Sequence, residues 1–147
     1  MKNPDDQALH KLLAEIKTIA VIGLSDKPHR ASYRVASYMQ NKGYRIIPVN
    51  PRLKQVLGET VYPNLALIPD PVDLVNVFRK SEDVPLVMEE ALPMKPRAIW
   101  LQLGISHPGA AAAARDEGVL MIMDCCLMVK HRQLFPEPVE PCGCAKL

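Results

Sequence analysis

Basic and small polar residues recur immediately after short apolar segments of this chain. Backbone N–H groups of turns, hydroxyl groups and the side chains of lysine and arginine are the groups with which proteins hold phosphate. Their recurrence after successive apolar segments predicts a site for an anionic ligand that carries several phosphate groups. The residues are Gly23, Ser25, Lys27, Arg30, Ser32 and Tyr33 after the first segment, Asn50, Pro51, Arg52 and Lys54 after the second, Phe78, Arg79 and Lys80 after the third, and Gly104 after the fourth.

The apolar segments themselves have the composition of buried β-strands. They are short, nearly continuous in apolar and often β-branched residues, and bounded by turn residues or charges. Pro48 removes a hydrogen-bond donor from the second segment, which favours a position near the edge of a sheet or at the end of the strand. Strands are expected at residues 18–23, 44–49, 72–78, 97–103 and 119–123.

Helical patterns separate these strands. Ser32, Ser81 and either Ser106 or His107 are expected to cap helices. Residues 52–71 are expected to be irregular, with a short turn at Leu57-Gly58, because prolines interrupt them. Asp124, at the end of the fifth strand, is expected to cap the turn that follows it. Helices are expected at residues 6–17, 33–42, 82–94, from 108 to about 118, and 126–134.

Strand and helix therefore alternate along the chain. This alternation, with strands that lack a polar face, predicts an α/β fold: a Rossmann-like, doubly wound, mainly parallel five-stranded sheet with helices on both faces. Ligands of such sheets bind outside the carboxyl ends of the strands, where the strand order reverses. The basic residues follow the strands and are thus expected to meet at that edge.

Length and charge narrow the class of protein. The 147 residues suit one domain, expected at 1–135, followed by a proline- and cysteine-containing tail at 136–147. The net charge of +2 argues against nucleic acid as the partner. The sequence contains no apolar run of about 18 residues and no signal peptide at its start, so we expect a cytoplasmic protein that does not enter the membrane.

The dinucleotide-binding pattern G-x-G-x-x-G is incomplete after the first strand. Ser25 and Pro28 occupy the second and third glycine positions. Asn50, with Arg52 behind it, stands where an NAD site has the acid that binds the ribose hydroxyls. These substitutions disfavour NAD and leave NADP, or another ligand with a phosphorylated ribose, as alternatives.

Cysteines and histidines show no catalytic or metal-binding pattern. Cys125, Cys126, Cys142 and Cys144 lack the C-x-x-C spacing of common structural zinc sites, and we expect reduced thiols. None of the four histidines lies next to a nucleophile and an orienting group in the sequence, so we expect no acid–base catalyst among them.

Six motifs together resemble the small bacterial and archaeal CoA-binding domain family. That family is similar in turn to the N-terminal Rossmann-like domain of the succinyl-CoA synthetase alpha subunit. The resemblance runs from about residue 19 to 134. Its motifs are V-I-G-L-S at 21–25, S-Y-R-V at 32–35, G-Y-R-I-I-P-V-N-P at 43–51, D-L-V-N-V-F-R at 73–79, W-L-Q-L-G at 100–104 and M-D-x-C at 123–126.

The resemblance implies a distribution of roles along coenzyme A. Gly23, Ser25, Arg30 and Ser32 would hold the pyrophosphate; Asn50, Pro51 and Arg52 would lie by the adenosine and its 3′-phosphate; Phe78, Arg79 and Gly104 would line the rest of the groove. Cys125 replaces the arginine of the commoner M-D-R-C motif, so no phosphate contact is expected from position 125. The sequence shows no second domain with a phosphorylated histidine, so the ligase reaction is not expected.

We therefore expect non-catalytic binding of coenzyme A or an acyl-CoA. The alternatives are an NADP-dependent oxidoreductase and an interaction module that has lost its ligand. A homodimer or an unidentified protein partner is compatible with the sequence. Cys125 and Cys126 are expected to be idle thiols, and a mixed disulfide with the thiol of coenzyme A is the weaker hypothesis.

Overall fold

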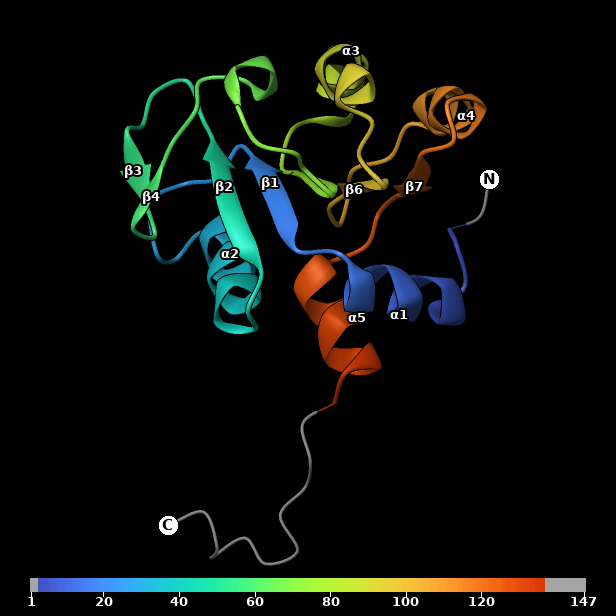
Figure 1. Cartoon of the computed structure of the whole chain (residues 1–147), viewed down its shortest axis with the longest axis horizontal. Helices are drawn as coiled ribbons and strands as arrows, with labels where there is room; N and C mark the ends of the chain where they lie inside the picture. Colours follow the sequence, from blue (N-terminus) through green and yellow to red (C-terminus); the bar gives the residue numbers. More distant parts are fainter. Residues whose placement is uncertain (1–2, 137–147) are drawn as a thin grey trace, which may run out of the picture.

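A five-stranded parallel sheet organises the computed structural model, which describes residues 3–136 (Figure 1). The strand order is β2-β1-β5-β6-β7, and every pairing within it is parallel. Pro48 lies in the edge strand β2, as predicted. The strands are β1 (Thr18–Ile22), β2 (Arg45–Val49), β5 (Leu74–Val77), β6 (Ala98–Leu101) and β7 (Leu120–Ile122).

Helices cover both faces of the sheet, which confirms the doubly wound prediction. Helices α3 and α4 lie on one face, and α1, α2 and α5 lie on the other (Figure 1). None of the helices within residues 3–136 has the length and hydrophobicity needed to cross a membrane. The helices are α1 (Asp6–Glu15), α2 (Ala31–Asn41), α3 (Val84–Ala91), α4 (Pro108–Asp116) and α5 (Leu127–Leu134).

Each central strand is buried on both sides. In β1, Ala20 and Ile22 join the core beneath α3 and α4, whereas Ile19 and Val21 join the core beneath α1, α2 and α5. Trp100 of β6 is completely buried in the second core, and its Nε1 donates to the Cys125 carbonyl at 2.8 Å. Because both pleat directions meet a helix layer, the strands read as apolar runs rather than as alternating patterns.

The chain reverses its winding direction between β1 and β5. It moves outward from β1 to the edge strand β2, then returns across β1 to pair β5 on the other side. The loops that leave β1 and β5 therefore diverge, which opens a crevice at the carboxyl ends of these strands. The candidate site lies at this switch point.

Residues 52–71 are more ordered than the sequence predicts. They contain a small antiparallel pair, β3 (Gln55–Val56) and β4 (Glu59–Thr60), and a 3₁₀ turn, η1 (Leu65–Leu67). Leu57 and Gly58 join the two strands with φ of 55° and 76°. A two-residue hairpin needs positive φ at such positions, and leucine gives no signal for that conformation.

Two predicted helix caps are wrong. Helix α2 begins at Ala31 with Arg30 as its N-cap, so Ser32 lies inside the first turn instead of capping it. Ser81 begins a short 3₁₀ turn, η2 (Ser81–Asp83), and its Oγ accepts from the Ser106 N–H at 3.1 Å instead of capping α3. The predicted helix 82–94 is thus divided into η2, α3 and η3 (Leu92–Met94). The predicted cap His107 is confirmed, because its ring accepts from the Ala110 N–H at 3.0 Å.

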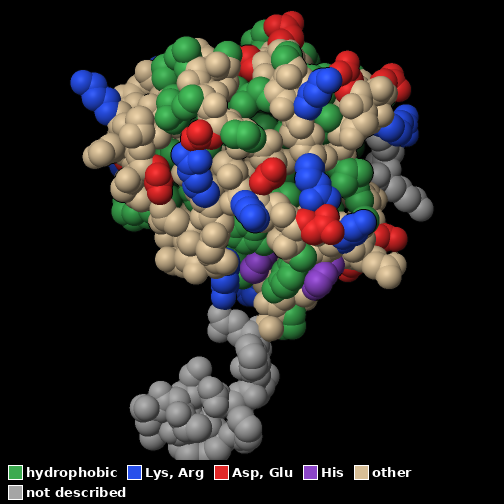
Figure 2. All heavy atoms as spheres, in the orientation of Figure 1, with side chains coloured by type: hydrophobic (Ala, Val, Ile, Leu, Met, Phe, Trp, Pro, Cys, Tyr) green, Lys and Arg blue, Asp and Glu red, His purple; other side chains and the backbone are tan. Residues whose placement is uncertain are grey.

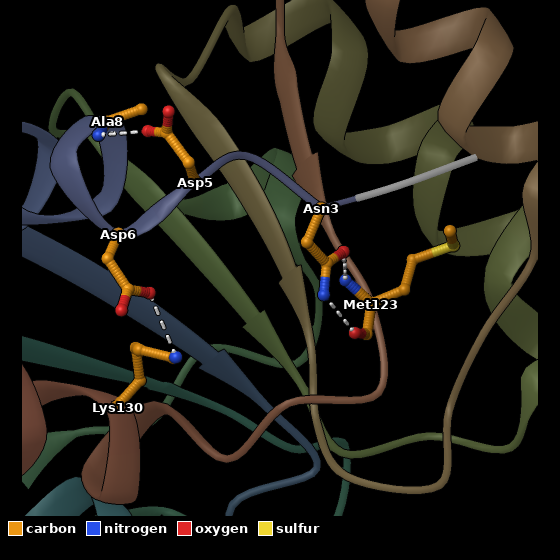
Figure 3. Close-up of polar contacts among 6 residues, drawn as sticks. All are labelled: Asn3, Asp5, Asp6, Ala8, Met123 and Lys130. Atoms are coloured by element: carbon orange, nitrogen blue, oxygen red, sulfur yellow. Dashed lines mark hydrogen bonds and ion pairs between the residues drawn. The ribbon is translucent and has the colours of Figure 1, made fainter.

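Polar side chains fix the amino-terminal segment to the sheet and to α5. The side-chain amide of Asn3 accepts from the Met123 N–H and donates to the Met123 carbonyl, both at 2.8 Å (Figure 3). Asp5 caps α1 through the Ala8 N–H, and Asp6 pairs with Lys130 of α5 at 3.2 Å. The Asn3 side chain therefore pairs with the backbone just after β7, at the edge of the sheet, as a neighbouring strand would.

His131 is buried where α5 meets α2. Its Nδ1 lies 2.9 Å from the hydroxyl of Tyr38, and its ring stacks on Phe135 and meets the edge of Tyr44. Burial lowers the pKa of His131 below its ordinary 6.5, and the nearby charge of Lys42 lowers this pKa further. The folded chain therefore favours the neutral form of this imidazole more than the unfolded chain does.

Acidification should destabilise the chain through His131. The unfolded chain binds the imidazole proton more readily, so this contribution to stability is complete above the ordinary pKa of 6.5 and is lost as the pH falls through the folded-state pKa. We expect urea unfolding at pH 7.5 and pH 5 to show a smaller pH-dependent loss of free energy for His131→Phe than for the native chain. The exposed His29→Asn variant should keep the native loss. An equal loss for His131→Phe would contradict the assignment.

Candidate functional site

The loop after β1 is held by its own serines. The Ser25 N–H donates to Ser32 Oγ at 3.0 Å, and the Lys27 N–H donates to Ser25 Oγ at 3.0 Å. The Arg30 N–H then donates to the Lys27 carbonyl at 3.0 Å. This short-range network explains why Ser32 does not cap α2, and it fixes where Lys27 and Arg30 leave the backbone.

Gly23 has no room for a side chain, because the backbone of a neighbouring strand passes close to it. Its φ is 82°, and a Cβ built on it would lie 2.6 Å from the carbonyl oxygen of Phe78. Its N–H donates to the Val49 carbonyl at 2.9 Å. The absent side chain makes room for the backbone that follows β5, and Gly23 also lines the cavity described next.

A cavity of about 730 Å³, here called the switch-point cavity, opens at the start of α2. Arg30, the N-cap, supplies no side-chain cap bond, and the first turn of α2 carries no acid. None of the ion pairs within residues 3–136 involves Lys27, Arg30 or Arg52. Uncapped helix N–H groups beside such cations suit a phosphate. The lining residues are Gly23, Ser25, Asp26, Lys27, Arg30, Ala31, Ser32, Asn50, Arg52, Leu53 and Phe78.

Asn50 joins the loops that follow β1 and β2. Its Nδ2 donates to the Leu24 carbonyl at 3.1 Å, and its Oδ1 accepts from the Arg52 N–H at 2.8 Å. The side chain at the position of the dinucleotide-site acid is thereby used to hold the loop that carries Arg52. The position contributes no carboxylate to bind a ribose.

An apolar groove of about 590 Å³ continues from the switch-point cavity. Ala31 and Phe78 line both spaces, so the two are contiguous. Leu103, which lines the groove, is 69% exposed, a high value for a leucine. The other lining residues are Arg34, Val35, Arg79, Lys80, Gln102, Ile105, Cys126, Met128 and Val129.

Gln102 places a polar group in this groove. The residue is only 5% exposed, and its Oε1 accepts from Asn76 Nδ2 at 3.2 Å and from the Leu127 N–H at 3.3 Å. No hydrogen bond among the described residues uses its Nε2. Asn76 Oδ1, buried beside it, likewise has no partner within residues 3–136. Sequence reasoning missed Gln102, although a glutamine within the apolar W-L-Q-L-G run was a signal of a buried polar role.

A third, smaller cavity of about 210 Å³ lies between the exits of β2 and β5. Pro51, Asn64 and Arg79 contribute to its lining, and the Oδ1 of Asn64 is buried without a partner among the described residues. The Arg79 guanidinium lies 3.3 Å from the Asp83 carboxylate, so its charge is partly compensated.

The structure brings most of the predicted site residues together. Gly23, Ser25, Lys27, Arg30, Ser32, Asn50, Arg52 and Phe78 all line the switch-point cavity, while Pro51 and Arg79 line adjoining spaces. Tyr33, Lys54 and Gly104 line none of the three cavities described above. Tyr33 packs against the core beneath α2, and Lys54 is exposed with its carbonyl bonded to the Val61 N–H.

Asp124 has a different partner from the one expected. Its Oδ1 accepts from the Gly104 N–H at 2.6 Å, so the carboxylate joins two loops instead of capping the turn after β7. Its backbone adopts φ of 52°, which directs the chain toward α5. The prediction of a local cap is wrong because the β6 exit loop provides a donor within reach.

Charge elsewhere on the molecule is more evenly mixed. On the face shown in Figure 2, lysine and arginine side chains are interspersed with aspartate and glutamate. Cys125 and Cys126 are free thiols, and residues 3–136 contain no cluster of potential metal ligands. The predictions for Cys142 and Cys144 lie outside the described residues.

This geometry defines a class of protein: a parallel α/β domain with a cationic cavity at its switch point. The chain belongs to the CoA binding domain family, whose model matches residues 17–132. It is 42% identical over 131 residues to the uncharacterized protein YneT of Bacillus subtilis, covering 89% of this chain and 97% of that one.

Solved structures share the fold of this chain. A Thermus thermophilus structure is 38% identical, with a TM-score of 0.86 over 90% of this chain and all of that one. A hypothetical protein from Pyrococcus horikoshii is 29% identical, with a TM-score of 0.86 over 91% of this chain and 96% of that one.

A longer enzyme shares the domain. The chain is 30% identical over 109 residues to an ADP-forming acetate–CoA ligase of Archaeoglobus fulgidus, covering 72% of this chain but 16% of the ligase. The similarity thus extends over a small part of that enzyme. The predicted likeness to succinyl-CoA synthetase stays a prediction.

Proposed function

We propose that the chain binds coenzyme A, or an acyl-CoA, without transforming it. The observation that carries this proposal is the continuity of the cationic switch-point cavity with the apolar groove. Coenzyme A has a matching division, because its phosphates lie at one end and its largely uncharged pantetheine arm extends from them. The family match supports the same ligand.

The phosphate end fits the start of α2. The pyrophosphate would lie against the uncapped N–H groups of the first turn, with Lys27 and Arg30 beside it. These cations have no competing ion pair within residues 3–136, so the ligand would supply their counter-charge. The Arg52 backbone is fixed by its hydrogen bond to Asn50, and the Arg52 side chain would bind the 3′-phosphate of the ribose.

The pantetheine arm fits the apolar groove. Val35, Phe78 and Leu103 offer apolar contact to its methylene and methyl groups. The free Nε2 of Gln102 could donate to one of the two amide carbonyls of the arm, which would satisfy a donor that the protein leaves unpaired.

The NADP-dependent oxidoreductase remains the second candidate. Arg52 would suit the 2′-phosphate of NADP as well as the 3′-phosphate of coenzyme A. The apolar groove and the family match favour coenzyme A. Cytoplasmic location and a possible homodimer or protein partner stay predictions.

Ligand-dependent melting and calorimetry test the proposed function. We expect saturating coenzyme A to raise the melting temperature, and dephospho-CoA to bind at least about tenfold more weakly because it lacks the phosphate that Arg52 would hold. NADPH at the same concentration should have little effect. Equal affinities for CoA and dephospho-CoA would contradict the role of Arg52.

The overall proposal has its own failing outcome. If coenzyme A and acetyl-CoA leave the melting temperature unchanged at millimolar concentration, binding of this ligand class is excluded. If NADPH alone stabilises the chain, the oxidoreductase becomes the favoured candidate, and hydride transfer to carbonyl substrates should then be measured.

A further inference from the structure

Cys126 lines the apolar groove, although it follows the last strand by several residues. It is the N-cap of α5, and its side chain makes no cap hydrogen bond. It is a free, partly exposed thiol. The sulfur is therefore not occupied by a structural role in capping the helix.

The groove around Cys126 carries an independent sign of a ligand. Gln102, which is nine-tenths buried, lines the same groove, and no hydrogen bond among the described residues uses its Nε2. Natural interiors rarely leave such groups unsatisfied. A ligand with amides in its chain would pair with the Gln102 donor, and pantetheine is such a chain.

The groove adjoins the switch-point cavity at one place, which sets how a ligand that spans both spaces would be oriented. Ala31 and Phe78 mark its junction with the phosphate-holding cavity, and Cys126, Met128 and Val129 belong to the groove alone. In coenzyme A the thiol is the end of the arm remote from the phosphates. A ligand with its pyrophosphate at α2 and its arm in the groove would bring its sulfur toward the residues of α5.

Cys125, next in sequence, is placed differently. It does not line the groove, and its carbonyl accepts from Trp100 Nε1. Burial raises the pKa of the Cys125 thiol above its ordinary value, which reduces the thiolate needed for exchange at neutral pH. The two adjacent cysteines therefore form a natural pair of test and control.

We propose that Cys126 captures the ligand covalently by thiol–disulfide exchange with the disulfide form of coenzyme A. This inference rests on the proposed function. The Cys126 thiolate attacks one sulfur of CoA disulfide, a bond forms between Sγ and that sulfur, and the original S–S bond breaks. The second CoA leaves as a thiolate and takes up the proton that Cys126 released. The oxidised sulfur pair comes entirely from the ligand disulfide.

Mass spectrometry of the full chain tests this step. After incubation with CoA disulfide, we expect a mass increase of one CoA, reversed by dithiothreitol and mapped to Cys126 by peptide analysis. Cys126→Ser should lose this adduct, whereas Cys125→Ser should keep it at the native rate. Desulfo-CoA, which lacks the thiol, should suppress the reaction by occupying the groove, and glutathione disulfide should react at least about tenfold more slowly because it lacks the nucleotide.

Two failures can be told apart. Binding of reduced CoA to the native chain under reducing conditions tests the proposed function without involving Cys126. If CoA binds but no adduct forms, or if adducts spread equally over Cys125, Cys126 and the tail cysteines, capture at Cys126 is overturned while binding stands. If reduced CoA does not bind, both conclusions fall.

Discussion

Replacing Gly23 with alanine should lower the free energy of unfolding by about 3 kcal/mol or more. Two effects combine at this position. The backbone φ of 82° disfavours any side chain, at about 1–2 kcal/mol, and the new Cβ would meet the Phe78 carbonyl oxygen at 2.6 Å. That oxygen belongs to the backbone just after the central strand β5. Relief of the contact therefore requires the carboxyl ends of β1 and β5 to move apart.

Gly118→Ala provides the matched control. Gly118 has a similar φ of 76°, but a Cβ there would meet nothing within 4 Å. Urea unfolding should therefore show a loss of only about 1–2 kcal/mol for Gly118→Ala. Equal losses for the two variants would mean that β1 and β5 can separate at little cost, and the explanation given for Gly23 would be wrong.

The same close approach links stability to the site. Gly23 and Phe78 are neighbours across the switch point, and both line the cavity. A shift that relieves an alanine at position 23 would also move the loop that carries Lys27 and Arg30. Melting and ligand affinity should therefore decline together in Gly23→Ala.

The sheet was predictable because its strands are buried on both faces. The apolar runs mark every one of its strands, and the parallel arrangement that they predict brings Lys27, Arg30 and Arg52 to one edge of the sheet, where the structure has them. Pro48 even indicated the edge strand. These conclusions depend on composition and on connectivity rules, both of which a sequence carries directly.

The details that failed depend on which of several available partners a polar side chain contacts. The Ser32 hydroxyl could cap α2 or accept from the loop, and it accepts from the Ser25 N–H. The carboxylate of Asp124 finds Gly104, a residue twenty positions away. The apolar groove forms where α2, the loop after β6 and α5 meet. No periodic pattern within a single segment of the sequence could predict it.

Arg30→Glu should abolish most of the affinity for coenzyme A while the fold persists. Arg30 is the N-cap of α2, and a carboxylate near a helix N-terminus stabilises the helix by about 0.3–1 kcal/mol. The same carboxylate would occupy the anion position and repel a pyrophosphate. We expect the dissociation constant to rise by at least about tenfold, and more at low salt, since charge-assisted contacts to phosphate are replaced by repulsion.

Lys11→Glu separates this local effect from net charge. Lys11 is exposed on α1, is not among the residues that line the described cavities, and undergoes the same change of charge. Calorimetry should therefore give native affinity for Lys11→Glu, and urea unfolding should give Arg30→Glu at least native stability. If Arg30→Glu binds coenzyme A as tightly as the native chain does, the start of α2 is not where the phosphates lie, and the orientation that places the ligand thiol near Cys126 loses its anchor.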